Sequence, residues 1–143
     1  PFGSGSFNEI YKFPKPVYAI LKRLLLMREA LRDYVMEQMK AAHENGTPVM
    51  RPLFYDFPND AKTWDVADEY MFGPDLLIAP IFKSNAHERK IYLPVGSEWI
   101  DVRSTEKYTG GRTITADAPI NNIPVFTRAD RPVQALLEFE NKK

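Results

Sequence analysis

Carboxylate side chains gather in one stretch of this 143-residue sequence, and their number suggests acid–base chemistry. Two carboxyl groups about 5 Å apart across a bond can act as nucleophile and acid–base catalyst, as in retaining glycosidases. The spacing here favours structural roles instead. Asp60 is typical of a cap at a turn or helix start, and its neighbours suit the polar face and first turn of a short helix over residues 65–71. We therefore assign no catalytic residue to this stretch, which contains Asp56, Asp60, Asp65, Asp68 and Glu69.

The two histidines, His43 and His87, do not form a site by their spacing. His43 falls in the last turn of a predicted helix, and His87 falls in a polar segment typical of an exposed turn. Neither has a second His or Cys at metal-ligand spacing, and the sequence contains no cysteine, which excludes Cys-ligated zinc and a disulfide scaffold. Ser4 and Ser6 lack the strand-to-helix turn that activates a nucleophilic serine. The residues predict neither a metal nor an organic cofactor.

The charge balance and the lengths of the apolar runs limit which kinds of partner this chain can bind. Lys plus Arg and Asp plus Glu number 19 each, so no net field attracts nucleic acid or acidic lipid. No apolar run approaches the roughly 20 residues that cross a bilayer. We expect neither nucleic-acid nor membrane binding, and the absence of cysteine favours a cytoplasmic protein.

The N-terminal third has the periodicity of one long helix after a loop over residues 1–14. From Pro16 to about Glu44, apolar residues recur at three- and four-residue steps. Pro16 suits the first turn, and Asn45-Gly46 suits a left-handed cap. At 1.5 Å per residue the helix is about 40 Å long, with room for one break. Its apolar face is wide enough to lie against something large: Val17, Ile20, Leu21, Leu24, Leu25, Leu26, Met27, Leu31, Tyr34, Val35, Met39 and Ala42.

After Gly46 short apolar runs separated by Pro, Gly, Asn and Asp predict an antiparallel sheet or sandwich. Gly110-Gly111 suits a turn between two strands. The fold class is therefore α+β, a long N-terminal helix followed by an antiparallel β-sandwich-like domain. The predicted strands cover residues 49–55, 76–82, 90–93, 98–102, 112–115, 123–127 and 133–139.

The two tryptophans, Trp64 and Trp99, have the rings that stack on sugars, but they equally suit a core. Trp99 lies in an alternating strand, which favours the core. On the residues alone, the chain is an α+β domain with no assigned activity.

A series of ordered segments resembles glycoside hydrolase family 31, the α-glucosidase and α-xylosidase family. The segment from Gly46 to Asp60 resembles the family's stretch after the last barrel helix, and Asp68 to Ile81 resembles a second hallmark. Shorter matches follow in the family's order. The resemblance covers most of residues 9–128, although residues 28–36 lack the Leu-Pro pair common in relatives. The shorter matches are 89–94, 99–101, 108–111, 118–120 and 123–126.

The resemblance implies a retaining α-glycosidase built on a (β/α)₈ barrel with C-terminal β domains and without a cofactor. The family's two catalytic aspartates precede the matched region, and their motifs are absent from this sequence. The resemblance therefore assigns no catalytic residue to this chain, and we expect the chain by itself to be inactive. Hydrolysis of α-glucosides or α-xylosides is expected of the longer parent enzyme, which would hold the α-linked oligosaccharide.

The resemblance also divides the chain into two parts. Residues 1–46 correspond to a loop and the last barrel helix, and residues 47–143 correspond to the proximal C-terminal β domain. The expected role is scaffolding, in which Leu21, Leu24, Leu31 and Val35 pack against the barrel. Two alternatives stay open: a stand-alone carbohydrate-binding β-sandwich module, and an interaction module that associates with itself through the helix face.

Overall fold

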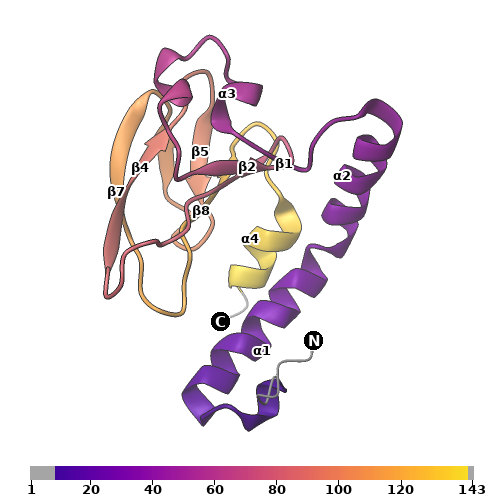
Figure 1. The fold of residues 1–143 in the computed structure, drawn as a ribbon, viewed down its shortest axis with the longest axis vertical. Helices are drawn as coiled ribbons and strands as arrows, with labels where there is room; N and C mark the ends of the chain where they lie inside the picture. Colours follow the sequence, from indigo (N-terminus) through magenta and orange to yellow (C-terminus); the bar gives the residue numbers. More distant parts are fainter. Residues whose placement is uncertain (1–8, 142–143) are drawn as a thin grey trace.

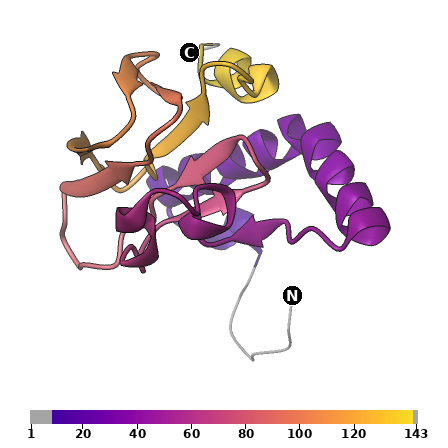
Figure 2. The same ribbon diagram turned by 90° about the horizontal axis from the view of Figure 1, so that it is seen from above.

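The computed structural model describes residues 9–141 of the chain. Two consecutive helices form an arm on one side of the molecule, and two antiparallel sheets form the body on the other (Figures 1 and 2). The last helix, α4, lies between the arm and the sheets. The elements are η1 (Ile10–Lys12), α1 (Lys15–Ala30), α2 (Arg32–Asn45), β1 (Met50–Arg51), α3 (Leu53–Asp56), η2 (Ala61–Trp64), β2 (Tyr70–Phe72), β3 (Leu76–Ile78), β4 (Glu88–Leu93), β5 (Glu98–Asp101), β6 (Lys107–Thr109), β7 (Arg112–Asp117), β8 (Val125–Arg128) and α4 (Gln134–Asn141).

The long N-terminal helix is present, with one break at Leu31. Leu31 ends α1 and begins α2 with φ −85° and ψ 1°, and its N–H still donates to Met27 O at 3.1 Å. Pro16 lies in the first turn, where its missing N–H costs no hydrogen bond. Gly46 ends α2 in the left-handed region at φ 70°, and its N–H donates to Ala42 O. The sequence signals at both ends are confirmed.

The strands form a six-stranded sheet in the order β1-β2-β3-β8-β5-β6 and a two-stranded sheet of β4 and β7. Every strand pair is antiparallel. In the larger sheet β5 lies between β6 and β8, with Trp99 opposite Tyr108 and Ile100 opposite Thr127. The α+β class, with its helix followed by an antiparallel sandwich-like body, is confirmed.

The core has two parts. The first joins the two sheets around Trp99, whose side chain is fully buried and whose indole N–H donates to Pro94 O at 3.2 Å. The second joins the sheet to the helices: Leu76, Val133 and Leu136 pack there with Met27 and Leu31 of the arm. The β body therefore has a core of its own, and the arm is attached through a separate apolar seam.

Two predicted strands are wrong. Of residues 49–55 only Met50 and Arg51 form a strand, because Pro52 starts the short helix α3. Residues 133–139 belong mostly to helix α4, since Leu136 and Glu140 are buried four residues apart on the same face. A short apolar run fits either period, and packing against α1 selects the helix here.

The short helix predicted over residues 65–71 is also absent. The helical turn comes earlier, as η2, and Tyr70 to Phe72 pair with β1 and β3 as strand β2. Gly110 and Gly111 do follow β6, but β6 pairs with β5 while β7 pairs with β4. These glycines therefore carry the chain from one sheet to the other and are not a hairpin turn. Residues 1–8 of the predicted N-terminal loop, with Ser4 and Ser6, lie outside the described residues.

Candidate functional site

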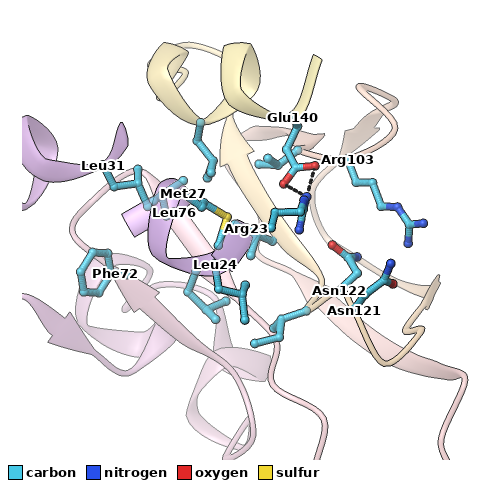
Figure 3. A pocket seen from close by; sticks show the side chains of 15 residues that line it. Arg23, Leu24, Met27, Leu31, Phe72, Leu76, Arg103, Asn121, Asn122 and Glu140 are labelled. Carbon is cyan, nitrogen blue, oxygen red and sulfur yellow. Dashed lines mark hydrogen bonds and ion pairs between the residues drawn. The ribbon is translucent and has the colours of Figure 1, made fainter. Parts of the chain in front are cut away.

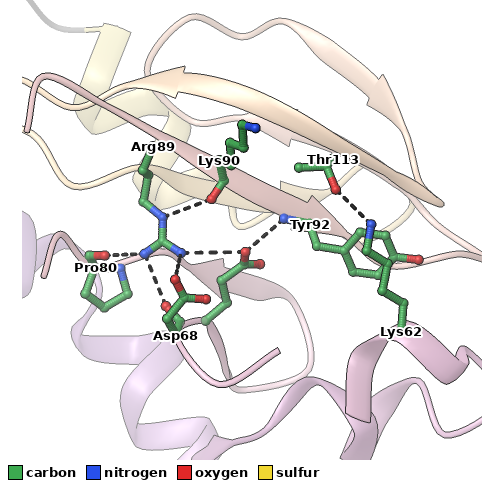
Figure 4. Close-up of polar contacts among 8 residues, drawn as sticks. Lys62, Asp68, Pro80, Arg89, Lys90, Tyr92 and Thr113 are labelled. Atoms are coloured by element: carbon green, nitrogen blue, oxygen red, sulfur yellow. Dashed lines mark hydrogen bonds and ion pairs between the residues drawn. The ribbon is translucent and has the colours of Figure 1, made fainter. Parts of the chain in front are cut away.

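Two of the suspected carboxylates, Asp68 and Glu69, form ion pairs with Arg89, which lies far away in sequence (Figure 4). Arg89 on β4 reaches across to the segment before β2, where its guanidinium lies 2.9 Å from Asp68 and 3.7 Å from Glu69. It also donates to the carbonyl oxygen of Pro80. Glu69 in turn accepts the backbone N–H of Tyr92 at 2.8 Å. The cluster ties the strand β2 to the smaller sheet.

Among the suspected acids, Glu69 has the carboxyl whose pKa is shifted furthest from its ordinary value. Burial raises its pKa to about 7, against the opposing effects of the Tyr92 N–H and the Arg89 guanidinium. Its side chain is only 3% exposed. A sugar ring has no access to an acid buried this far, and the neighbouring Asp68, 61% exposed, is paired with Arg89. The two acids are therefore structural partners of Arg89 and not a catalytic carboxylate pair.

Asp60 is a cap, as its sequence position predicts. One of its oxygens accepts the N–H of Lys62 at 3.2 Å at the start of η2. The other accepts the N–H of Val95 at 2.9 Å and the hydroxyl of Tyr92 at 2.8 Å. Both oxygens are thus occupied by local backbone and by the smaller sheet, which fixes η2 against the body.

A second buried ion pair joins strand β1 to helix α3. Arg51 and Asp56 approach to 3.2 Å, with side chains only 7% and 15% exposed. Burial raises the pKa of the Asp56 carboxyl, and the charge on Arg51 opposes that rise. Asp75 pairs with Arg131 at 3.3 Å in the same region. The first pair joins β1 to α3, and the second joins the turn after β2 to the segment between β8 and α4.

The histidines do not enter any of these clusters. His43 lies exposed at the end of α2, and His87 lies exposed in the bend before β4. Within residues 9–141, no three His, Asp or Glu side chains come together as a metal site. In the same range, no helix is both long and apolar enough to span a membrane.

The two tryptophans differ completely in exposure. Trp99 is in the core, as predicted from its alternating strand. Trp64 is 58% exposed at the end of η2 and stacks on Phe54 of α3, with ring centroids 4.5 Å apart and an interplanar angle of 8°. Its indole N–H donates to Pro58 O at 3.2 Å. The Trp64 ring is therefore fixed in orientation with one face covered.

An apolar groove lies where the arm meets the body (Figure 3). Its cavity volume is about 170 Å³, and Arg23 and Glu140 form an ion pair at one end. Leu24 and Leu31 line it together with Leu76 of β3. The expectation that Leu24 and Leu31 face a separate barrel is therefore wrong, because both point toward this chain's own body.

The side of the arm turned away from the body is where apolar residues are exposed. Leu25, Val35 and Met36 line one shallow depression across the junction of α1 and α2, together with the charged residues Arg28, Glu29 and Arg32. We call the three apolar residues the outer helix face. Leu25 is 48% exposed and Met36 is 63% exposed. Leu26 and Met39 beside it are 53% and 54% exposed. Large apolar side chains exposed in one region are typical of a surface that another part of a protein covers.

The fold combines a β body that has its own core, buried acids, and a helical arm that exposes several apolar side chains. Residues 46–131 match the model described as the glycosyl hydrolase family 31 C-terminal domain, and the chain belongs to this family. The family resemblance seen in the sequence is thereby confirmed.

Relatives in this family are several times longer. The sulfoquinovosidase of Agrobacterium fabrum is 37% identical over 85% of this chain and 18% of its own length. Human neutral alpha-glucosidase AB is 35% identical over 85% of this chain and 13% of its own length. A solved family 31 alpha-xylosidase from a soil metagenome, complexed with xylose, is 49% identical with a TM-score of 0.89, over 92% of this chain and 20% of that one. The chain thus spans about a fifth or less of these relatives.

Proposed function

We propose that this chain forms the structural C-terminal region of a longer family 31 α-glycosidase and braces its catalytic barrel. The observation that carries this proposal is the outer helix face, which exposes apolar side chains on an arm whose other side is already packed on the β body. Exposing an apolar helix face to water raises the free energy of the protein, and a barrel packed on that face removes the exposure.

This placement gives a separate role to each of the two parts of the chain. Residues 1–46 supply the last barrel helix, and residues 47–143 form the proximal β domain. The seam of Met27, Leu31 and Leu136 then sets the position of the helix relative to the β domain. The match of the family's C-terminal domain to residues 46–131 supports a boundary near Gly46.

The activity of the longer protein is retaining hydrolysis of α-glucosides or α-xylosides, which the names of its relatives favour. That chemistry needs two carboxylates and no cofactor. The buried, arginine-bound acids of this chain support a site elsewhere in the longer protein. The partner of this chain is therefore the barrel, and its α-linked oligosaccharide reaches the chain only through the barrel. The absence of cysteine favours a cytoplasmic location.

The experiment that tests this proposal is a chimera. This chain replaces the matching segment of the soil-metagenome alpha-xylosidase, which is 49% identical to it, and hydrolysis of p-nitrophenyl α-xyloside is measured. We expect an active chimera. Changing Leu25 and Met36 to Lys places two charges in the interface, and it should abolish activity while the same substitutions leave the isolated chain folded. An active, stable double variant contradicts the scaffolding role.

The isolated chain provides the complementary test. We expect no hydrolysis of α-glucosides or α-xylosides by the chain alone, and weak, concentration-dependent association in light scattering through the outer helix face. A tight homodimer at low concentration, dispersed by Leu25→Lys and Met36→Lys, favours the self-associating interaction module instead. Hydrolysis by the isolated chain contradicts the assignment of the catalytic residues to the barrel.

A further inference from the structure

Trp64 presents a rigid aromatic face to solvent that neither the core nor the outer helix face uses. The other face of the indole is covered by Phe54, nearly coplanar at 8°. The indole N–H is already donated to Pro58 O, so the ring cannot turn without losing that bond. The 58% of Trp64 that remains exposed is therefore a preformed aromatic platform, and a ligand that stacks on it has little side-chain freedom to remove.

Polar groups lie on the other side of the same loop. Residues 58–60 connect the Pro58 carbonyl, which holds Trp64, to an open cleft of about 480 Å³. Asn59 and Arg128 line this cleft with Asp56 and the backbone of Gly96. The exposed amide of Asn59 has donors and an acceptor for sugar hydroxyls, whereas Asp56 is paired with Arg51 and Arg128 with Asp130. A flat aromatic face bound to the loop that carries this amide matches a pyranose, which has an apolar C–H face and a polar hydroxyl edge.

The surroundings disfavour a nucleic acid as the stacking ligand. Asp60 and Asp65 lie at the two ends of η2, which carries Trp64, and their charges repel a phosphate backbone. Lys62, the nearest cation in sequence, is engaged: its Nζ lies 2.9 Å from the Thr113 hydroxyl and 4.4 Å from the centre of the Tyr92 ring (Figure 4). A neutral, hydroxyl-rich ligand suits this charge distribution.

We propose that Trp64, on its Phe54 support, is a carbohydrate-binding surface that holds a unit of an α-linked oligosaccharide. This inference rests on the proposed function, because the same molecule then meets such an oligosaccharide as substrate. The platform keeps a chain-like substrate near the enzyme between hydrolytic events. The platform adds to the avidity of the whole enzyme for the oligosaccharide. We therefore expect the isolated surface to bind a sugar weakly, with a Kd in the millimolar range.

Two-dimensional NMR of the isolated chain tests the surface, with the two indole N–H signals as reporters. Isomaltotriose and maltose are titrated to tens of millimolar, with glycerol at equal concentration as the control. We expect a saturable shift of the Trp64 signal and an unmoved Trp99 signal, since Trp99 is fully buried. No saturable shift of Trp64, or the same shift with glycerol, overturns the proposal. A shift with a proline-rich peptide and none with sugar assigns the platform to a peptide and also overturns it.

Variants separate the platform from a general loss of folding. Phe54→Leu removes the supporting ring while keeping Trp64, and we expect at least a several-fold weaker titration. Tyr11→Ala changes an aromatic that is also exposed, at 69%, and should leave the titration unchanged. An unshifted Trp99 signal shows that each variant is folded. Because the titration needs no barrel, a failed titration beside an active chimera overturns this inference alone, and a failed chimera beside a sugar-binding chain overturns only the scaffolding role.

Discussion

The hydroxyl of Tyr34 on α2 lies 2.2 Å from the point that a Cβ on Gly73 would occupy. Gly73 turns the chain between β2 and β3 at φ 61°, a backbone conformation that favours glycine. The same hydroxyl donates to Phe72 O at 3.0 Å. The arm and the body thus meet at a contact that only a residue without a side chain permits.

Replacing Gly73 with Ala should destabilise the isolated chain by about 2–4 kcal/mol, because strain at positive φ adds to displacement of the Tyr34 ring. Tyr34→Phe alone should cost about 1 kcal/mol through the lost hydrogen bond. Urea unfolding of both single variants and the double variant measures their coupling. We expect the double variant to be more stable than the sum of the two costs implies, by about 1 kcal/mol, because Phe no longer places an oxygen against the new methyl group. Strict additivity contradicts the contact.

Gly110 is constrained by backbone and not by a side chain. A Cβ there would lie 2.0 Å from Pro94 O and 2.7 Å from Ser97 O. The backbone at this crossing between the two sheets cannot move aside without breaking the bond from Gly110 N to Ser97 O. Gly110→Ala should therefore cost more than about 3 kcal/mol or prevent folding.

Gly46→Ala is the matched control for this substitution. Gly46 has open space around its Cβ position and only a positive φ of 70°, so we expect a loss of about 1 kcal/mol. The comparison is made by urea denaturation of both variants under identical conditions. Equal costs for the two glycines contradict the close approach at Pro94.

The sequence alone predicts those elements whose residue pattern is long and does not depend on contacts with distant parts of the chain. The arm follows from thirty residues of helical periodicity bounded by Pro16 and Gly46. Helix α4 was missed because its apolar run is too short to distinguish the two periods, and its burial depends on α1. The same limit applies to the orientation of Leu24 and Leu31, since a periodic apolar face does not reveal which body covers it.

The candidate site residues show the same contrast between local patterns, which the sequence reveals, and contacts between distant elements, which it does not. Trp99 was placed correctly because alternation is local, and the exposure of Trp64 was left open because its support, Phe54, belongs to another element. The burial of Glu69 depends on Arg89, twenty residues later and on the other sheet. No spacing rule links those two residues, so the sequence alone favoured an exposed helix face for an acid that the fold buries.

The buried Glu69 carboxyl should make the stability of the chain depend on pH. Burial raises its pKa in the folded chain to about 7 from an ordinary value near 4.5, so the folded state binds more protons than the unfolded state between these values. Stability from this group is present in full below pH 4.5 and is lost as the pH rises through about 7. Burial raises the pKa values of Asp56 and Asp75 as well, and they act in the same direction.

Glu69→Gln removes this titration while keeping an oxygen for the Tyr92 N–H, and Asp68 still pairs with Arg89. At pH 8 the free energy of unfolding of the variant should exceed that of the parent by roughly 2 kcal/mol, and at pH 5 the two should be nearly equal. Thermal melts followed by circular dichroism at the two pH values measure the difference. Glu88→Gln, which neutralises an exposed acid on β4, is the control and should change neither value. A Glu69→Gln gain that is equal at both pH values contradicts the role of its ionisation.

The two sides of the arm should respond in opposite ways to truncation. Leu31 packs in the seam with Leu76 and Leu136, so Leu31→Ala should destabilise the isolated chain by about 2 kcal/mol. Leu25 is 48% exposed on the outer helix face, and Leu25→Ala should cost the isolated chain less than about 0.5 kcal/mol. In the chimera with the α-xylosidase, Leu25→Ala should cost about 1–2 kcal/mol, because the barrel then covers it. Urea unfolding of the isolated chain and of the chimera provides these three values. If Leu25→Ala is as mild in the chimera as in the isolated chain, the barrel does not pack on the outer helix face.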